Sequence, residues 1–472
     1  MIHMRICMLF EGSYPHVTGG VSTWAQMLIK NIKHHQFLLY TISAESKYQE
    51  KFKYDLPGNI ISVQEIFLDK ILEDRGSYGK RFHFSRDARH SLKALITGND
   101  IRWEPIFKMI RKKVVKNSLD FFMSIDFFDI LRDAYSEKYS RVPFTDFFWT
   151  IRSMLLPLFF LIQQPIPEAD LYHSASNGYT GFVGALAKYI HKKPFILTEH
   201  GIYSREREEE IIKSDWVSGQ FKDLWINFFK NISKMVYQHA DGVYTLFEKN
   251  KEIEVDLGCP EKKIEIIPNG IYIEDFQKNE NRDRGSLINI GSITRIAPIK
   301  DIKTMVQSFN IAKDKIGNIK LYIMGPTDDD EDYFNECLQL VERLKLEKDI
   351  LFTGRVNIGE YIGKMDILIL TSISEGQPFV ILEGMAARKP FIATDVGACR
   401  ELIYGHNDKF GKAGLITPMM NPNQIANAIM KLCQDGNMRE EMGRNGEKRV
   451  KQYYTAEKCI KSYKNLYDGF SE

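Results

Sequence analysis

The chain has 472 residues, 44% of them hydrophobic, and this size and composition favour two to three globular domains with separate cores. Its 64 Lys and Arg nearly balance its 62 Asp and Glu, so no overall basic field indicates a nucleic-acid-binding protein. The six cysteines are scattered without a CxxC pair or a paired histidine, which indicates a reducing compartment and argues against a zinc site.

The chain carries no strong signal for a membrane-spanning segment. Arg5 to Phe10 is predicted to be a strand, and it begins so early that we expect no signal peptide. The longest apolar run, Met154 to Ile162, falls short of the roughly 18 to 20 residues that a spanning helix needs and contains Pro157. We therefore expect a cytoplasmic protein, with a peripheral position at the inner membrane as the alternative.

The first predicted strand leads through the sequence EGSYPHVTGG into a predicted helix. Gly19, Gly20 and Val21 lie where that helix begins, and glycines there allow backbone amides to approach a phosphate or a sugar. The alternative is a tight turn that needs glycine only for a positive φ. The spacing differs from GxGxxG, so the turn is not a dinucleotide-binding fingerprint.

Strand and helix patterns continue through the first half of the chain. Strands are predicted over 37–42, 60–67, 170–174, 195–198, 240–245 and 264–267, and a helix over 181–189. His200 follows one of these strands, at the carboxyl end where open parallel sheets bind ligands. We expect it to bond to a sugar hydroxyl, with a purely structural histidine as the alternative.

A different pattern separates the third strand from the fourth, over residues 70–165. Between Arg75 and Lys116 there are twelve Lys or Arg and three acidic residues, and residues 121–162 are rich in Phe and Trp. The segment is predicted to be a helical insertion in the first domain. It is either a docking surface for anionic lipids or a membrane partner, or a helical subdomain with a solvated basic face and its own aromatic core; the second interpretation is favoured.

Polar residues 279–286 are predicted to be the linker between the domains, so the first domain is expected to end at 279 and the second to span 280–450. Residues 451–472 are expected to form a helix that crosses back to the first domain. Further strands are predicted over 287–293, 320–324, 350–352, 367–370, 391–393 and 414–417, with helices from near 301 and over 422–435 and 437–468. Tyr453, Tyr454 and Tyr463 are expected to pack back across the interdomain cleft.

Two cations, Arg295 and Lys300, lie between the first strand of the second domain and its first helix. Positive charge beside a helix N-terminus suits a diphosphate leaving group, because negative charge builds up there as the bond breaks. The alternative is two solvated loop cations. The acidic run 327–332 follows the next strand, and its consecutive loop positions predict a solvated turn rather than a metal site.

Residues 366–401 contain the pattern that dominates the prediction. A buried strand over 367–370 leads to a polar loop with Gly376, and Pro378 lies where a helix can begin. Glu375 precedes that helix and Glu383 lies on it. Carboxylates accept hydrogen bonds from vicinal hydroxyls, and a helix N-terminus favours a phosphate, so the pattern predicts a nucleotide-sugar site.

The segment SEGQPFVILEGMAA, followed by KPFIATDVGACREL, resembles the signature of the retaining family-4 glycosyltransferases, also called glycosyl transferases group 1. The GGV turn, GSITR with its later Lys, and PNG occur in the same order as in that family. The resemblance implies a GT-B fold, in which two Rossmann-like parallel-sheet domains face a cleft. Within the family, EGSYPHVTGGVSTW and TEHGIYSREREEEI are most similar to the PelF-type enzymes of the Pel exopolysaccharide system.

The resemblance also implies roles for individual residues. His200, Arg295, Lys300 and Glu375 would be catalytic, with the two cations holding the diphosphate in place of an obligatory metal. Glu383 would bind the ribose and Glu375 the donor sugar. The other expected donor-binding residues are Gly19, Gly20, Val21, Gly325, Val356, Gly376, Gln377, Pro378, Phe379 and Val380. The sequence departs from the family at Asp301, where many relatives have Gly, and at Gln377-Pro378, where Phe-Gly is commoner.

The expected function is transfer of a hexose from a UDP-sugar to a growing extracellular polysaccharide, with retention of configuration. UDP-glucose is favoured, and a UDP-N-acetylhexosamine is the alternative donor. The partners would be a nucleotide-sugar donor, a carbohydrate acceptor and inner-membrane proteins of polysaccharide synthesis or export, without nucleic acid. A nucleotide-sugar 2-epimerase and a non-catalytic nucleotide-sugar sensor are the competing functions, because fold alone does not separate them from a transferase.

Overall fold

The computed structural model describes residues 3–72, 79–98, 101–111, 114–115, 117–277 and 287–471. They form two compact units, of which the first contains Met1–Ile266 and Tyr463–Glu472 and the second Ile267–Ser462. The predicted boundary near residue 280 lies outside the described residues, and the two units divide after Ile266.

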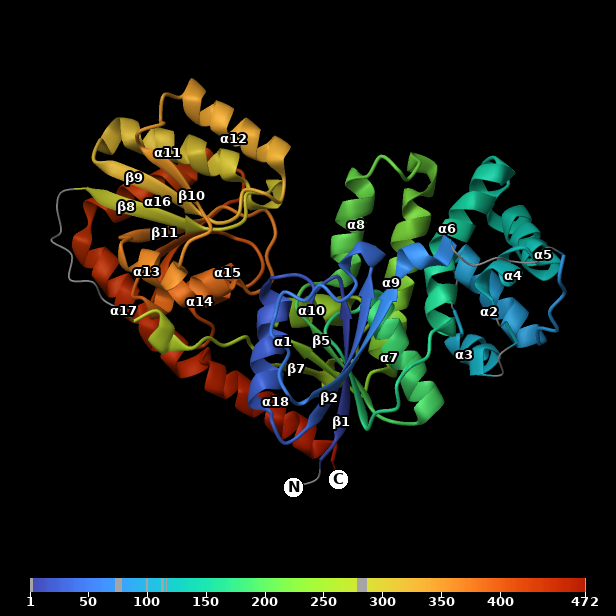
Figure 1. Ribbon diagram of the computed structural model, residues 1–472. Coiled ribbons are helices and arrows are strands. Elements are labelled where there is room, and N and C mark those ends of the chain that lie inside the picture. Colours follow the sequence, from blue (N-terminus) through green and yellow to red (C-terminus); the bar gives the residue numbers. More distant parts are fainter. Residues whose placement is uncertain are drawn as a thin grey trace. The chain divides into compact units, whose positions relative to one another are not determined.

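The first unit is built on a seven-stranded parallel sheet in the order β3-β2-β1-β4-β5-β6-β7, with helices on both of its faces (Figure 1). The strands are β1 (Arg5–Glu11), β2 (Gln36–Ser43), β3 (Ile60–Phe67), β4 (Leu171–Ser174), β5 (Phe195–Glu199), β6 (Gly242–Thr245) and β7 (Ile264–Ile266). The helices that flank them are α1 (Gly20–Asn31), α7 (Gly178–His191), α8 (Tyr203–Lys213), α9 (Lys222–His239) and α10 (Glu248–Asp256). All seven predicted strands are confirmed, with ends that shift by two residues or fewer.

Helices occupy the described part of the segment between β3 and β4. They are α2 (Arg86–Thr97), α3 (Trp103–Arg111), α4 (Ser118–Phe122), α5 (Ile125–Ala134) and α6 (Phe144–Gln163). Their aromatic side chains form a core, in which the rings of Phe121 and Phe159 stack with centroids 4.4 Å apart. Several basic residues pair with acids of the same segment, among them Lys93 with Glu137 and Arg102 with Asp87. These features fit the second interpretation, a helical subdomain with its own aromatic core.

Helix α6 bears on the prediction that the chain carries no strong signal for a membrane-spanning segment. Among the described residues it is the one helix long and apolar enough to span a membrane by length and composition, although half of that stretch is buried inside the protein. Its buried residues include Phe147, Ile151 and Leu158, which belong to the core of the first unit. The prediction counted only uninterrupted apolar residues, whereas the helix also includes Arg152 and other polar positions.

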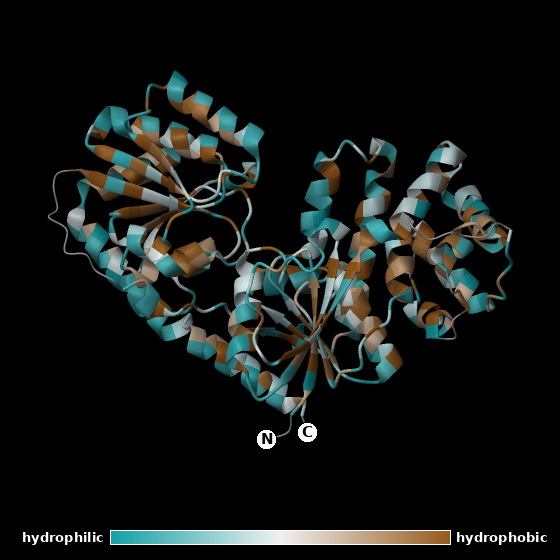
Figure 2. Ribbon diagram, viewed as in Figure 1, coloured by the Kyte–Doolittle hydropathy of each residue, from teal (hydrophilic) through white to brown (hydrophobic). Residues whose placement is uncertain are grey.

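The second unit has a six-stranded parallel sheet in the order β10-β9-β8-β11-β12-β13. The strands are β8 (Ile288–Ile293), β9 (Ile319–Met324), β10 (Ile350–Gly354), β11 (Ile367–Leu370), β12 (Phe391–Thr394) and β13 (Gly414–Thr417). The helices are α11 (Ile302–Ile316), α12 (Glu331–Arg343), α13 (Ile358–Gly363), α14 (Phe379–Ala386), α15 (Cys399–Tyr404), α16 (Pro422–Gln434) and α17 (Gly436–Tyr453). Hydrophobic residues dominate the central strands of both sheets (Figure 2), as expected for parallel sheets covered on both faces. The predicted fold class, two Rossmann-like parallel-sheet domains, is confirmed.

The helix predicted over 437–468 is two helices, α17 and α18 (Ala456–Gly469). The backbone at Ile271 interrupts the helical hydrogen bonding between α17 and α18. Ile271 N donates to the Tyr454 carbonyl (3.0 Å), and Ala456 N donates to the Ile271 carbonyl (2.9 Å). A side chain at Gly270 would lie 2.2 Å from the Thr455 carbonyl oxygen, so this close approach requires glycine.

The three C-terminal tyrosines differ in their surroundings. Tyr454 is buried in the second unit and Tyr463 in the first, whereas Tyr453 is 42% exposed. Packing of Tyr453 across the interdomain cleft stays a prediction, since the ring contacts of Tyr453 with Phe410 and Tyr454 lie within the second unit. Tyr463 and Tyr467, one helical turn apart on α18, are both fully buried in the first unit.

Candidate functional site

The loops after β8 and β11 are joined at the carboxyl edge of the second sheet. The hydroxyl of Thr371, which directly follows β11, donates to the Lys300 carbonyl (2.9 Å). Ile373 N donates to the Ile299 carbonyl (2.9 Å). Because β8 and β11 are neighbours in a parallel sheet, both loops leave from the same edge, and these bonds fix Lys300 beside the loop of Glu375.

Lys300 and Glu375 form an ion pair with 2.6 Å between Nζ and Oε1. The same carboxylate oxygen accepts a hydrogen bond from Ser372 Oγ (2.5 Å). Both charged side chains are largely buried, with 17% and 11% exposed. The structure thus brings together two of the predicted site residues, and it adds Ser372, which the sequence pattern did not single out.

Arg295, the other predicted phosphate cation, pairs with Asp329 on the loop after β9, at 2.9 Å. Two further carboxylates of that loop have other partners: Asp328 pairs with Arg355 (3.2 Å), and Asp330 accepts from Tyr333 N (2.9 Å) at the start of α12. Three consecutive carboxylates therefore diverge to three partners. This divergence is what a solvated turn predicts, and it is unlike the convergence of metal ligands.

Gly325 allows the loops after β8 and β9 to meet. Its φ is +155°, and a side chain there would lie 1.9 Å from the Thr294 carbonyl oxygen. Gly325 N donates to the Gly354 carbonyl (3.0 Å), and Ile296 N donates to the Pro326 carbonyl (3.1 Å). The strand-end loops that carry Arg295, Gly325 and Val356 are consequently adjacent.

The loop SEGQP is held from two sides. A side chain at Gly397, with φ +50°, would lie 2.1 Å from the Glu375 carbonyl oxygen, and Ala398 N donates to the Gly376 carbonyl (2.9 Å). Gln377 is buried, and its Oε1 accepts from Asn269 N (2.6 Å). Gln377, one of the positions at which the sequence departs from the family, thus hydrogen-bonds the SEGQP loop to Asn269 of the Pro268-Asn269-Gly270 segment.

Helix α14 begins where the sequence predicted. Pro378 is its N-cap residue, and Phe379 and Val380 form its first turn. Glu383 lies on this helix, and burial raises the pKa of its carboxyl from the usual 4.5 to about 7. This carboxyl group therefore changes its charge near neutral pH.

Asp301 shows how the chain accommodates its departure from glycine. Its φ is +48°, in the left-handed region that favours glycine and that Asp and Asn tolerate better than other residues. Its side chain is the N-cap of α11 and accepts from Thr304 N (3.3 Å). The aspartate keeps the backbone turn and adds a cap.

In the first unit, Gly19 is the N-cap of α1, and Gly20 and Val21 are the first two residues of that helix. The φ of Gly19 is 168°, which is extended backbone, and no atom lies within 4 Å of the position a Cβ would take. Neither a positive φ nor crowding requires glycine there, so the tight-turn alternative is wrong for Gly19.

His200 directly follows β5, as predicted, and packs against the ring of Trp24 with centroids 4.6 Å apart. Burial lowers the pKa of His200 to about 3, so the imidazole is neutral at physiological pH. Its Nε2 is buried and has no hydrogen-bond partner among the described residues, and the same holds for Ser204 Oγ nearby in the chain. This edge therefore holds unused hydrogen-bonding capacity.

A buried network that the sequence did not reveal lies beneath His200. His173 Nδ1 bonds to the Tyr467 hydroxyl and its Nε2 to Thr198 Oγ1, both at 2.8 Å. Tyr463 reaches Thr198 Oγ1 at 3.2 Å and contacts the ring of Trp24 at 5.3 Å. The end of α18 is thus part of the support of β4, β5 and Trp24.

Two buried carboxyl groups, Glu199 and Glu254, form a further unpredicted cluster. Tyr237 donates to Glu199 Oε2 (2.6 Å) and Tyr203 N to Oε1 (3.0 Å), whereas neither oxygen of Glu254 accepts a well-formed hydrogen bond among the described residues, although the Thr245 hydroxyl lies near enough to lower its pKa. Burial raises the pKa of both, and the Glu199 carboxylate further raises the pKa of Glu254. The protonated form is therefore favoured in the folded protein.

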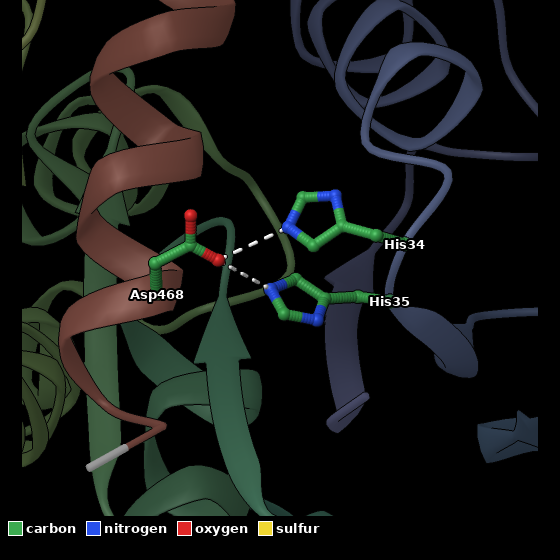
Figure 3. Close-up of side chains that lie close together, drawn as sticks. All are labelled: His34, His35 and Asp468. Atoms are coloured by element: carbon green, nitrogen blue, oxygen red, sulfur yellow. Dashed lines mark hydrogen bonds and ion pairs between the residues drawn. The ribbon is translucent and has the colours of Figure 1, made fainter. Parts of the chain in front are cut away.

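His34, His35 and Asp468 lie together at the opposite edge of the first sheet, where β1 and β2 begin (Figure 3). Asp468 Oδ1 lies 3.0 Å from His34 Nε2 and 3.3 Å from His35 Nε2. Met4 N donates to His35 Nδ1 (3.3 Å), which leaves the proton of a neutral His35 on Nε2, pointing to the carboxylate. His34 thus hydrogen-bonds α18 to the start of β2, whereas His35 Nε2 lies within ion-pair distance of Asp468 without forming a hydrogen bond.

Comparison with known proteins covers both halves of the chain. Residues 4–262, more than half of the 472, match the family described as Domain of unknown function (DUF3492). Residues 273–449 match the family described as Glycosyl transferases group 1.

Individual relatives agree with these matches. Uncharacterized glycosyltransferase MJ1069 of Methanocaldococcus jannaschii is 26% identical over 308 residues, covering 62% of this chain and 72% of that protein. The capsular polysaccharide biosynthesis glycosyltransferase CapM of Staphylococcus aureus is 26% identical over 309 residues, covering 61% of this chain and 74% of CapM.

Solved structures share the fold over nearly the whole chain. Anabaena Alr3699/HepE in complex with UDP superposes with a TM-score of 0.63 at 15% identity, covering 99% of this chain and 100% of that one. Its complex with UDP-glucose gives a TM-score of 0.61 at 15% identity and the same coverage. The chain therefore belongs to the DUF3492 family, its second unit matches the glycosyl transferases group 1 family, and its fold is of the GT-B class.

Proposed function

We propose that the protein is a retaining glycosyltransferase that moves a hexose from a UDP-sugar, with UDP-glucose favoured, to a carbohydrate acceptor in extracellular polysaccharide synthesis. The observation that carries the proposal is the buried Lys300–Glu375 pair at the carboxyl edge of the second sheet, next to the loop of Arg295. Glycosyltransferase relatives and the UDP-glucose complex of a protein with the same fold support the donor class.

The roles of the residues follow from the chemistry of the leaving group. When the bond between the anomeric carbon and the diphosphate oxygen breaks, negative charge develops on the diphosphate. Lys300 and Arg295 supply two cations at the edge of one sheet, so we assign them to this charge, without an obligatory metal. As Lys300 turns to the phosphate, Glu375 is released to accept hydrogen bonds from donor-sugar hydroxyls.

The remaining assignments follow from the resemblance to the family and are made separately for each unit. Glu383, whose pKa is about 7, accepts hydrogen bonds from the ribose when it is ionised. Neutral His200, with Nε2 unpartnered among the described residues, is assigned to a hydroxyl of the transferred sugar. We assign the turn at Gly19 and Gly20 to binding of the donor phosphates, and Val356 to binding of the nucleotide base.

The finer identity, a PelF-type enzyme of Pel polysaccharide synthesis with inner-membrane partners, rests on EGSYPHVTGGVSTW and TEHGIYSREREEEI. It places the reaction in the cytoplasm, where the donor is made, beside a membrane complex. In that setting the acceptor is a growing chain of sugars.

The test is UDP release from a panel of UDP-sugars by the purified protein, with and without membranes from the same cells. Turnover of one donor that disappears in Glu383→Ala and Lys300→Ala supports the proposal and names the sugar. Tight donor binding with no UDP release under any condition overturns it in favour of a sensor. Conversion of the donor sugar without an acceptor overturns it in favour of an epimerase.

A further inference from the structure

Each of the two proposed phosphate cations is paired with a carboxylate of the chain itself, and the two pairs differ in burial. Lys300 and Glu375 are 17% and 11% exposed, whereas Arg295 is 58% and Asp329 28% exposed. Arg295 meets Asp329 through one guanidinium nitrogen, Nη1, at 2.9 Å. An exposed pair with a single contact contributes little to stability and is readily exchanged for another anion.

The protein backbone holds Asp329 in this place. On one side of it, the Pro326 carbonyl accepts from Ile296 N, the residue after Arg295. On the other side, Asp330 caps α12 by accepting a hydrogen bond from Tyr333 N. Contacts before and after Asp329 therefore fix the loop beside Arg295, and its carboxylate is not a freely moving surface charge.

We propose that Asp329 is an internal counter-anion of Arg295 that the donor diphosphate must displace, so that this carboxylate lowers the affinity of the protein for its donor and product. The inference rests on the proposed function, because it takes Arg295 as a diphosphate ligand. Two effects act in the same direction. The phosphate has to break the ion pair, and the displaced carboxylate then repels the bound phosphate from the same loop.

The test measures the affinity of the full-length protein for UDP and for uridine by calorimetry at low salt. Asp329→Asn should bind UDP roughly two- to five-fold more tightly, as expected for an exposed ion pair, and uridine with unchanged affinity. Asp332→Asn, which removes an exposed charge of the same acidic run, is the matched control and should bind both ligands as the unmodified protein does. The gain in Asp329→Asn should disappear when Arg295→Gln is also present.

Unchanged or weaker UDP binding by Asp329→Asn overturns the inference; weaker binding would make Asp329 a residue that positions Arg295. An equal gain for uridine also overturns it, because uridine has no phosphate. These outcomes are distinct from failure of the proposed function, in which the unmodified protein binds no UDP or Arg295→Gln binds it with undiminished affinity.

Discussion

The carboxyl edges of the two sheets are built differently. In the second unit Lys300 pairs with Glu375 and Gln377 bonds to the backbone of Asn269, although Asp301 Oδ2 and Asn269 Oδ1 have no partner among the described residues. In the first unit, buried polar atoms of His200, Ser204 and Glu254 have no partner among the described residues. The second edge is thus centred on a buried ion pair, whereas the first holds a neutral histidine with an unpartnered ring nitrogen.

Removing the cation at the centre of the second edge tests this contrast most strongly. Lys300→Ala should lower the rate of UDP release roughly 100- to 1000-fold, because the charge on the leaving diphosphate loses a positioned cation. Lys303→Ala is the control, since Lys303 is three residues away on α11 and pairs with Glu336 at the surface. Turnover by Lys300→Ala at the rate of the control would remove the catalytic assignment of this pair.

The hydrogen bond of Gln377 tests the same edge without touching a charge. Gln377→Ala leaves the buried Asn269 N–H without its acceptor, so we expect the free energy of unfolding to fall by about 1 to 3 kcal/mol. Chemical denaturation measures the change. Gln339→Ala, at an exposed position of α12, should change stability by less than about 0.5 kcal/mol, and equal losses in both variants would contradict the prediction.

Substitutions at Asp301 distinguish the contribution of its side-chain cap to stability from that of its left-handed backbone conformation. Asp301→Ala loses the cap and keeps an unfavourable left-handed residue, so we expect a loss of about 1 to 3 kcal/mol. Asp301→Asn retains both the cap and the tolerance for positive φ, and its stability should match that of the unmodified protein. A loss in Asp301→Asn as large as in Asp301→Ala would show that the negative charge of Asp301, rather than its geometry, stabilises the loop.

The unpaired carboxyl of the first edge predicts a pH dependence. Burial raises the pKa of Glu254 and Glu199 above that of the unfolded chain, so the folded protein keeps protons that the unfolded chain loses. The contribution of these two carboxyl groups to the free energy of unfolding is fully present below the unfolded pKa of about 4.5. It declines as the pH rises toward the pKa values of the folded protein. The thermal midpoint should therefore fall between pH 5 and pH 9.

Glu254→Gln removes the titrating group and should flatten this decline. Its thermal midpoint should exceed that of the unmodified protein at pH 8 and differ less at pH 5. Glu252→Gln, which changes an exposed position of the same helix, should keep the original pH profile. An unchanged profile in Glu254→Gln would assign the pH dependence to other groups.

Local patterns in the sequence were sufficient for the strands and for the position of the Glu375 loop. Apolar runs ended by glycine, proline or polar residues predicted all thirteen strands of the two sheets, because parallel strands are buried on both faces. The ion pair of Lys300 with Glu375 was not predicted, although one rule explains it, that strand ends of a parallel sheet share an edge. Here the signal lies within short stretches of chain.

The contacts that escaped prediction join residues distant in sequence. Gln377 and Asn269 are 108 positions apart, and nothing near either residue indicates the other. The break between α17 and α18 depends on Ile271, and the clustering of Glu199 with Glu254 depends on the packing of three helices and a strand. Tertiary contacts of this kind override the helical pattern, which on its own continued through Tyr454.

The assignment of residues 463–472 to the first unit has a consequence for the order of folding. Tyr463 and Tyr467 fill its core, and Asp468 bonds to His34. A ribosome synthesises these residues only after the whole second unit, so the nascent first unit lacks two core aromatic rings while the second is being made. The first unit can therefore complete this part of its core only after residues 267–462 have been synthesised.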